Sequence, residues 1–522
     1  MAKYIFKRLL HGLISVLIVV LIVMLLVYST MDRELVFSQD PNYIKYTGNS
    51  REVYRHEQWE KYGYIDYVPY ADYLIQLGLD TEERIAADFG NTAAQDSPTA
   101  KEYVAKFTKY YESKGYTVVR LDQKSGANNF KCLFAYKDIN VFVRFWNFIT
   151  GIVKIDNIHN AKGIADEDRK ITFTWYDPAY YTYDEAGNVI DKKFSPAIMG
   201  NGTTHKYLFY FDNKFPFIHQ NLVSISLGTS YAVNRDVDVW DTMTQAQGAY
   251  VYDNVVYPTG YSESSPNNIH SATYVEGSLQ LGGDFKQLRY IDDYTGVQTN
   301  KGGKSQMGYS FTIGIISTVI AYALGLPLGI YLARKKDKLA DKLGMIYIIF
   351  IIAVPSLAYI FMFKALGLSI GLPTTFDTSG NWLYYVLPII SLALPSIGGL
   401  MKWMRRYMID QSNLDYVKFA RSGGLSEGQI FRKHIMKNAL IPILNGIPGS
   451  ILGALTGAII TERVYVVPGV GNVLTNAINV YDNSVIVGVT LFYALLSVVS
   501  LILGDVLMAL SDPRINFSEK AR

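Results

Sequence analysis

Long uncharged apolar runs constrain this chain more than any other feature of its sequence. One run covers residues 9–28, directly after a basic N-terminus. The others follow residue 305, beyond a polar stretch at 31–305. A run of eighteen or more apolar residues matches the ~30 Å hydrocarbon core of a bilayer, whereas a soluble enzyme spreads its apolar residues at helix or strand periods. The sequence therefore predicts a helical protein that crosses a membrane several times.

Six segments qualify as membrane spans, so the predicted fold is an α-helical polytopic membrane protein with about six transmembrane helices. They cover residues 9–28, 307–333, 345–366, 382–401, 440–460 and 485–510. A secretory signal peptide would have a shorter apolar run and a small-residue cleavage site. The first segment is therefore expected to be an uncleaved span.

Basic residues fix the expected orientation, because they stay on the cytoplasmic side of short loops. If Lys3, Lys7 and Arg8 lie inside, alternation also places the clusters at 334–338 and 402–406 inside. Residues 31–305 then lie outside, and they carry 28 Lys plus Arg against 35 Asp plus Glu. We expect a multi-pass protein of the bacterial cell membrane with both termini cytoplasmic and residues 31–305 extracellular.

The expected domains are a first unit at 1–30, an extracellular domain at 31–305 and a helical membrane core at 306–522. The inserted segment is predicted to be an α+β domain. Strands are expected at 116–120, 170–175 and 206–211, helices within 41–79 and 100–115, and loops at 255–305. Such a domain is either a dock or lid for an extracellular partner or a structural insertion whose aromatic residues form its own core.

Several chemistries find no support in the sequence. The one cysteine, Cys132, permits no intrachain disulfide or zinc cluster. The phosphate-binding pattern G-x-x-x-x-G-K-[ST] is absent. We expect no catalytic residue, no metal site, no bound cofactor and no nucleic-acid partner, and any ATP and Mg²⁺ would be bound by partner subunits.

The loop between the fourth and fifth predicted spans has a distinct local pattern. Residues 414–422 fit a short amphipathic helix, and Gly423-Gly424 fits its end, since glycine readily adopts the left-handed conformation of a helix C-cap. Ser426 is a suitable N-cap for a second, basic helix that enters the membrane at Ala439. Two helices joined at a glycine corner could dock a cytoplasmic subunit. The alternative is an ordinary basic loop that attracts anionic lipid.

This loop resembles the EAA loop of ABC importer permeases, and within them that of the dipeptide/oligopeptide permease family. The resemblance rests on a few residues at matching spacing: Tyr416, Ala420-Arg421, Gly424-Leu425, Arg432, His434, Asn438-Ala439-Leu440 and Pro442. Lys418 and Phe419 depart from the general EAA consensus. The loop as a whole is expected at 405–440.

Two further segments resemble the same family. Residues 461–471, which contain Glu462, Pro468 and Gly469, are similar to its Glu-x-x-Phe-x-x-Pro-Gly-x-Gly element, and residues 512–514 are similar to its C-terminal Asp-Pro-Arg. Residues 227–237 resemble a segment that often precedes the second span, although here they lie farther from it.

The resemblance implies a type I ABC importer permease that moves oligopeptides or dipeptides into the cell. Implied partners are a homologous second permease, two cytoplasmic ATPases, an extracellular substrate-binding lipoprotein, peptide and membrane lipid. The residues expected to form the ATPase-docking helix are Tyr416, Lys418, Phe419, Ala420, Arg421, Ser422, Gly424 and Leu425.

Pore or gate candidates come from the helix-breaking and ionisable residues of the predicted spans. They are Pro395, Pro448, Glu462, Pro468 and Gly469. Breaks of this kind are tolerated where neighbouring helices satisfy the freed backbone groups. The competing interpretation of Glu462 and of other polar residues near span ends is interfacial placement, without a role in transport.

Two other classes of membrane protein remain open at this point. An ABC-associated mechanotransmission protein also has a large domain after its first span, but typically has four spans. A secondary transporter working alone would usually need ionisable groups at the membrane midplane and internal repeats, and the sequence offers neither clearly.

Overall fold

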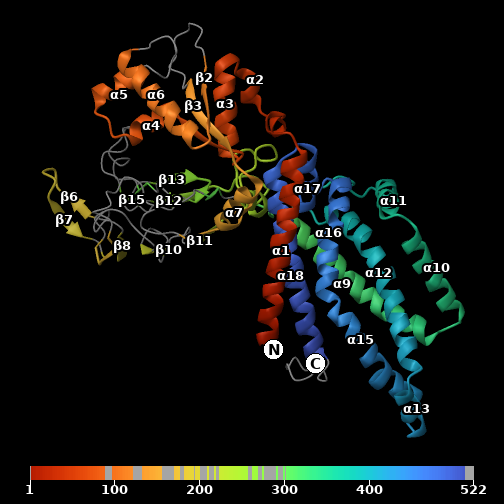
Figure 1. Cartoon of the computed structure of the whole chain (residues 1–522). Coiled ribbons are helices and arrows are strands. Elements are labelled where there is room, and N and C mark those ends of the chain that lie inside the picture. Colours follow the sequence, from red (N-terminus) through yellow and green to blue (C-terminus); the bar gives the residue numbers. More distant parts are fainter. Residues whose placement is uncertain are drawn as a thin grey trace.

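A computed structural model describes most of the helical part of the chain and about two thirds of the inserted segment. The described residues are 2–88, 97–121, 132–155, 170–176, 181–192, 194, 196–199, 209–210, 217–218, 223–256, 262–268, 273–274, 290–291, 298–299 and 301–511. We call residues 31–305 the inserted domain. The end of the helical bundle nearest to it is the proximal end, and the opposite end is the distal end (Figure 1).

Helices account for nearly all of the bundle. Its elements are α1 (Ala2–Thr30), α9 (Gln306–Arg334), α10 (Leu339–Ala353), α11 (Ser356–Ser369), α12 (Leu383–Ser412), α13 (Asp415–Ser422), α14 (Glu427–Gln429), η7 (Ile430–Ile435), α15 (Met436–Asn445), α16 (Ile447–Tyr465), α17 (Val470–Asn479) and α18 (Asn483–Ser511). The start of α1 and the end of α18 both lie at the distal end (Figure 1). The predicted helical polytopic fold is confirmed.

Four single helices, α1, α9, α12 and α18, are long and apolar enough to cross a membrane. Two bent pairs bring the number of candidate spans to as many as six: α10 with α11, and the segment from α14 to α15 with α16. The predicted span at 345–366 falls on the bent pair α10 and α11, which meet at 106°. Pro355 cannot donate a backbone hydrogen bond and forces Val354 into an extended conformation, which ends α10 there.

Helices α9 and α12 make the closest long helix–helix contact of the bundle. A Cβ atom at Gly325 would lie 2.8 Å from the Leu400 Cβ, and one at Gly329 would lie 2.8 Å from the Met404 Cβ. Glycine at both positions therefore lets the two backbones approach more closely than larger residues would allow. Membrane helices use small residues in this way, because lipid provides no hydrophobic drive for association.

The first part of the inserted domain is compact and combines helices with a sheet. Its elements are η1 (Arg33–Phe37), α2 (Pro41–Lys45), α3 (Gly48–Lys61), β1 (Ile65–Pro69), α4 (Tyr70–Gln76), α5 (Thr81–Asp88), α6 (Pro98–Ser113), β2 (Thr117–Arg120) and β3 (Leu133–Asp138). The antiparallel sheet has the order β1-β3-β2. The middle strand is buried at Leu133, Phe134 and Ala135, where it joins two aromatic-rich cores.

The second part contains short two-stranded ladders and two helices. These are α7 (Val141–Gly151), β4 (Val153–Ile155), β5 (Thr172–Thr174), β6 (Tyr181–Tyr183), β7 (Val189–Lys192), β8 (Ala197–Met199), β9 (Phe209–Tyr210), β10 (Phe217–Ile218), β11 (Val223–Ile225), α8 (Val239–Thr244), β12 (Asp253–Val256), β13 (Ser262–Ser265), β14 (Asn267–Asn268), β15 (Thr273–Tyr274), β16 (Tyr290–Ile291) and β17 (Gln298–Thr299). The pairs are β4–β11, β5–β8, β6–β7, β9–β10, β12–β13, β14–β17 and β15–β16.

The predicted α+β character of this domain is confirmed, but some of its details differ. Strands β2 and β5 and helix α6 fall where the sequence placed them, and β9 occupies the described part of 206–211. The prediction of loops throughout 255–305 is wrong, since strands occur among its described residues. Helices α7 and α8, which cover 11 and 6 residues, were not predicted.

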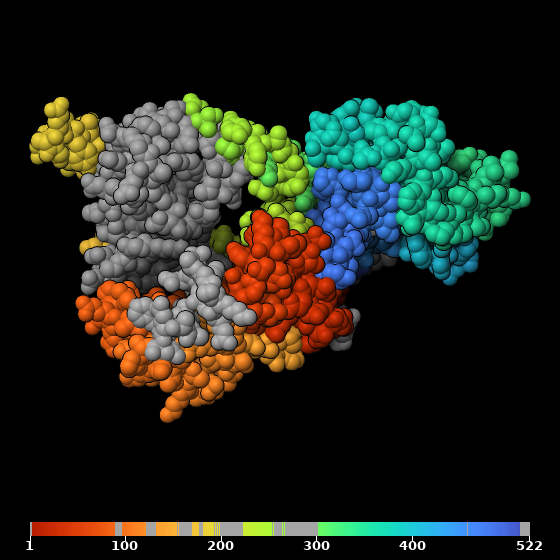
Figure 2. All heavy atoms as spheres, turned by 90° about the horizontal axis from the view of Figure 1, so that it is seen from above, coloured from red at the N-terminus to blue at the C-terminus, as the bar shows by residue number. Residues whose placement is uncertain are grey.

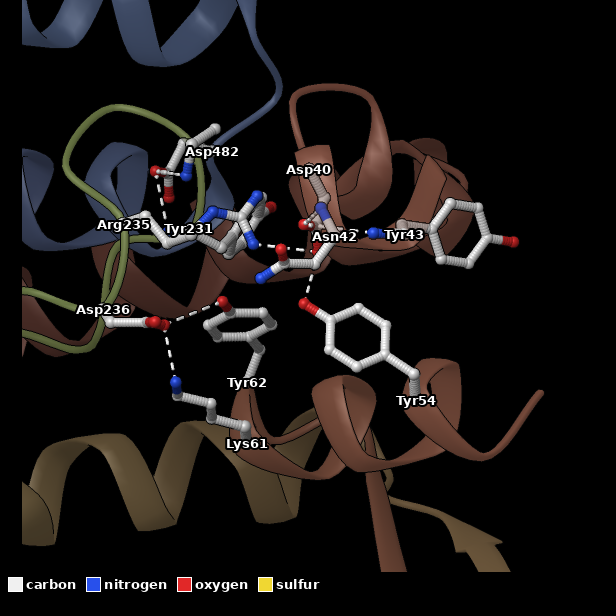
Figure 3. Close-up of polar contacts among 11 residues, drawn as sticks. Asp40, Asn42, Tyr43, Tyr54, Lys61, Tyr62, Tyr231, Arg235, Asp236 and Asp482 are labelled. Atoms are coloured by element: carbon white, nitrogen blue, oxygen red, sulfur yellow. Dashed lines mark hydrogen bonds and ion pairs between the residues drawn. The ribbon is translucent and has the colours of Figure 1, made fainter. Parts of the chain in front are cut away.

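A buried carboxylate joins the inserted domain to the bundle. Asp482, in the turn before α18, accepts hydrogen bonds through its Oδ2 from the Ser230 hydroxyl at 2.7 Å and from three successive backbone N–H groups, those of residues 231–233, at 2.9–3.1 Å. Beside it, Arg235 pairs with the buried Asp40 at 2.9 Å (Figure 3). Removing either carboxylate would leave buried donors without partners, which is costly in a folded protein.

The inserted domain covers only part of the proximal end. Viewed from that side, the described residues of the inserted domain lie mostly on the α1 side of the bundle, and α10 lies at the opposite edge (Figure 2). Contact also reaches α12, because the Lys304 Nζ lies 5.2 Å from the centroid of the Tyr385 ring.

The α9–α12 contact yields a stability prediction with a matched control. Alanine at Gly329 would collide with Met404 and with the Met401 carbonyl oxygen, 2.9 Å from the added Cβ, so we expect the free energy of unfolding to fall by about 1–3 kcal/mol. Gly399, which lies on α12, has no atom within 4 Å of an added Cβ. Thermal unfolding of the purified chain in detergent should show a lower midpoint for Gly329→Ala and an unchanged or higher midpoint for Gly399→Ala. Equal midpoints would contradict the packing.

Candidate coupling loop

Helix α13 forms the distal tip of the molecule, directly after the long helix α12 (Figure 1). Val417 is fully buried, and it packs with Met404 and Met408 of α12 and with Ile430 of η7. Tyr416 is half-buried, and its hydroxyl donates to the Gln411 Oε1 at 2.8 Å. The apolar side of α13 therefore fixes the helix to the end of α12, as the amphipathic pattern predicted.

The glycine corner has the geometry of a Schellman motif. Gly424 lies in the left-handed region with φ +83°. The N–H of Leu425 donates to the carbonyl of Ala420 at 3.2 Å, and the N–H of Gly424 donates to that of Arg421 at 3.1 Å. This double closure satisfies carbonyls at the end of α13 and turns the chain sharply. The predicted glycine end of the helix is confirmed.

The second helix begins as predicted at Ser426, which forms a capping box with Gln429. The chain then passes through the π-helical turn η7 into α15. Arg421 bridges the corner to Glu427, with its Nε 2.6 Å from the carboxylate oxygen. The carboxylate raises the pKa of Arg421, because it favours the charged guanidinium.

The outward side of the loop remains open to solvent. The Phe419 side chain is 75% exposed, the largest exposure of an apolar residue in the loop, and Leu425 is also exposed. Lys418 is exposed and pairs only with Asp415 of its own helix, at 2.9 Å. The Ser422 hydroxyl donates back to the Phe419 carbonyl at 2.9 Å. The structure thus brings the predicted docking residues together on one short projection. Their docking role stays a prediction.

An ion pair close to this loop was missed by sequence reasoning. Arg405 of α12 donates from Nε and Nη2 to both oxygens of Asp341 on α10, at 2.6 and 2.7 Å. Asp341 is buried, and it also accepts the Asp337 N–H at 2.9 Å. The sequence showed Arg405 only as one of several basic residues, and the partner 64 positions earlier carries no local signal.

Glu462 lies at the proximal end in a tight polar cluster. Its side chain is fully buried and accepts from the Ser310 hydroxyl at 2.6 Å and the Asn472 N–H at 3.1 Å. The first turn of α17 thus points backbone N–H groups at a carboxylate, which the helix dipole favours. A Cβ at Gly469 would lie 2.3 Å from the Glu462 Cδ, so only glycine fits there. The Pro468-Gly469 turn is therefore built around Glu462.

The two remaining pore candidates lie elsewhere in the bundle. Pro395 is inside the continuous helix α12 and is half-buried, and Pro448 is in the first turn of α16 after the 43° bend. Glu462, Pro468 and Gly469 thus lie together, whereas Pro395 and Pro448 lie elsewhere, and the pore or gate role of all five stays a prediction. The predicted Asp-Pro-Arg element at 512–514 lies outside the described residues.

Comparison with known proteins agrees with this architecture. A family model described as "Binding-protein-dependent transport system inner membrane component" matches residues 325–517. The chain is 34% identical, over its whole length and 99% of the relative, to the oligopeptide transport system permease protein AmiC of Streptococcus pneumoniae. The chain belongs to this family of inner-membrane transport components, and is a multi-pass membrane protein.

Other relatives match a smaller share of the chain. The dipeptide transport system permease protein DppB of Bacillus subtilis is 30% identical over 40% of this chain and 68% of the relative. Among solved structures, an amino acid ABC transporter crystallised with histidines matches 40% of this chain and 92% of that chain, at 16% identity and a TM-score of 0.31. The similarity to AmiC, in contrast, includes the inserted domain.

The two adjacent glycines of the corner provide a matched test of its geometry. Alanine at Gly424 must adopt φ +83°, which costs an L-residue about 1–2 kcal/mol, whereas Gly423 has φ −73° and tolerates alanine. We expect Gly424→Ala to uncouple ATP hydrolysis from uptake in the assembled transporter, while Gly423→Ala leaves the ratio unchanged. Uptake and hydrolysis are measured on the same preparation. Equal ratios for both variants would show that the corner conformation does not matter for coupling.

Proposed function

We propose that this chain is one of two permease subunits of an ATP-driven ABC importer that carries oligopeptides into a bacterial cell. The observation that carries the proposal is the similarity to AmiC across the bundle and the inserted domain together. A match to 40% of the chain, such as that to DppB, would support the transporter class but leave most of the chain without a counterpart.

The proposed partners follow from the chain's own features. The chain lacks a phosphate-binding motif, so ATP and Mg²⁺ belong to two ATPase subunits, and this chain is not an enzyme. The α13 projection, with Phe419 at its surface, suits a cleft in one ATPase. A homologous permease completes the pore, and a substrate-binding lipoprotein delivers peptide at the inserted domain.

The coupling mechanism that we propose uses the rigidity of α13 and α12. Val417 and Tyr416 hold α13 on α12, so a movement of the docked tip moves the distal part of α12 with it. The Arg405–Asp341 pair passes the movement to α10, and the α9–α12 contact passes it along the bundle. ATP binding would thus favour one of two pore states, which is the general logic of coupling between distant sites.

The proposed orientation places the distal end in the cytoplasm. Arg334 and its neighbours to Lys338 lie at the turn between α9 and α10, at the same end as α13 (Figure 1). Such basic clusters favour the cytoplasmic side. Both termini are then cytoplasmic and the inserted domain is extracellular.

A mechanotransmission protein that moves no substrate is the less favoured alternative. The relatives that match over the full chain or the bundle are named as permeases. The glycine corner between α13 and α14 also fits a docking permease.

A charged residue introduced at the α13 tip should disturb ATPase docking without disturbing the fold. Phe419 is 75% exposed, so we expect Phe419→Asp to leave folding intact but to prevent ATPase docking and to lower oligopeptide uptake at least tenfold. Leu339→Asp is the matched control, since Leu339 is 72% exposed at the same end but outside the loop. Co-purification of the ATPases and uptake of labelled oligopeptide by cells are the measurements. Full ATPase recovery and uptake with Phe419→Asp would refute the assignment.

A further inference from the structure

Helix α7 presents apolar residues on both of its sides. Asn140 caps its start, accepting the Phe142 N–H at 2.9 Å. On one side, Phe145, Phe148 and Ile149 pack against the core that α1 and α18 share. The helix is therefore fixed to the bundle rather than to the sheet of the inserted domain.

Among the residues that the structure describes, none covers the opposite side of α7. Phe142, Val143 and Trp146 are exposed, Trp146 to 65%. An apolar helix side left open on a well-packed protein marks an interaction surface. We call this side, together with the strand face described next, the α7 surface.

The adjacent strand pair β4–β11 extends this exposed apolar surface. Its register pairs Val153 with Ile225 and Ile155 with Val223, so the four side chains share one face, and all four are exposed. Neither strand contains an acidic residue, and α7 contains none either.

Helix α7 lies beside the last turns of α1, where the apolar run of α1 ends. The Arg144 guanidinium lies between the rings of Tyr28, in the last turns of α1, and Tyr64, at 3.7 and 4.0 Å from the ring centroids. Earlier in α1, Ile22 and Leu26 are exposed, as expected of side chains that face lipid. Tyr and Trp favour the interface between lipid tails and water. Figure 1 shows α7 beside this part of α1.

We propose that the α7 surface lies in the headgroup layer of the membrane leaflet on the side of the inserted domain, and that its partner is lipid. Helix α7 packs against α1, a candidate membrane span with exposed apolar side chains at Ile22 and Leu26, and this position favours lipid over a separate protein. The absence of acidic residues from α7, β4 and β11 removes repulsion from headgroup phosphates. An interfacial helix of this kind lies in the plane of the membrane and buries its apolar side among the acyl chains.

The surface gives the inserted domain a second attachment besides Asp482. Contact with lipid would limit tilting of the domain relative to the bundle, because α7 and the 230–233 segment hold it at different points. The proposal does not depend on the substrate that the chain transports.

Spin-label accessibility in the assembled complex tests the proposal directly. A nitroxide is attached to Trp146→Cys, with Ile18→Cys of α1 as the lipid reference and exposed Lys109→Cys of α6 as the water reference. The buried Cys132 is replaced by alanine in all three. The complexes are placed in nanodiscs of phosphatidylcholine and phosphatidylglycerol, and collision with oxygen is compared with collision with a water-soluble nickel chelate.

The expected result is an oxygen-to-nickel ratio at position 146 close to that at 18 and several-fold above that at 109. A ratio like that at 109 would place the α7 surface in water and overturn the proposal. Protection from both reagents would show a protein partner instead and would overturn it equally. If Cys132→Ala prevents assembly, quenching by brominated lipid in the otherwise native chain replaces the labels. Trp146→Phe should then reduce the quenchable fluorescence, and an unchanged quenchable fraction would count against lipid contact.

Discussion

The close packing of α9 against α12 is the contact on which the rest of the bundle depends. Lipid supplies no hydrophobic force between helices, so two long spans stay together only where their backbones approach closely. Gly325 and Gly329 allow that approach, and bulky residues of α12 fill the space opposite them. The two helices thereby form one rigid unit that extends from the proximal to the distal end (Figure 1).

Each end of this unit makes a different set of polar contacts. At the distal end, α12 continues into α13, and Arg405 ties it to Asp341 of α10. At the proximal end, Ser310 of α9 donates to Glu462, which in turn receives the first turn of α17. In the proposed coupling mechanism, a force on the α13 tip would reach the Pro468-Gly469 turn through packed helices and buried hydrogen bonds.

The sequence predicted those parts of the molecule that local chemistry determines. The apolar runs located the spans, Gly424 and Ser426 located the ends of two helices, and the alternation at 116–120 located a strand. The break at Pro355 was visible in the sequence, but the 106° angle depends on what packs around it. No local pattern encodes three other features. The Asp341–Arg405 pair and the contacts of Asp482 join residues far apart in the chain. The fit of Gly469 over Glu462 depends on close packing.

Reconstitution tests the central claim most directly. The chain is assembled with a second permease, the ATPases and the lipoprotein in liposomes, with ATP supplied on the ATPase side. The account predicts accumulation of a labelled oligopeptide that requires both ATP hydrolysis and this chain. Uptake that continues without ATP, or that is unchanged when this chain is left out, would contradict it.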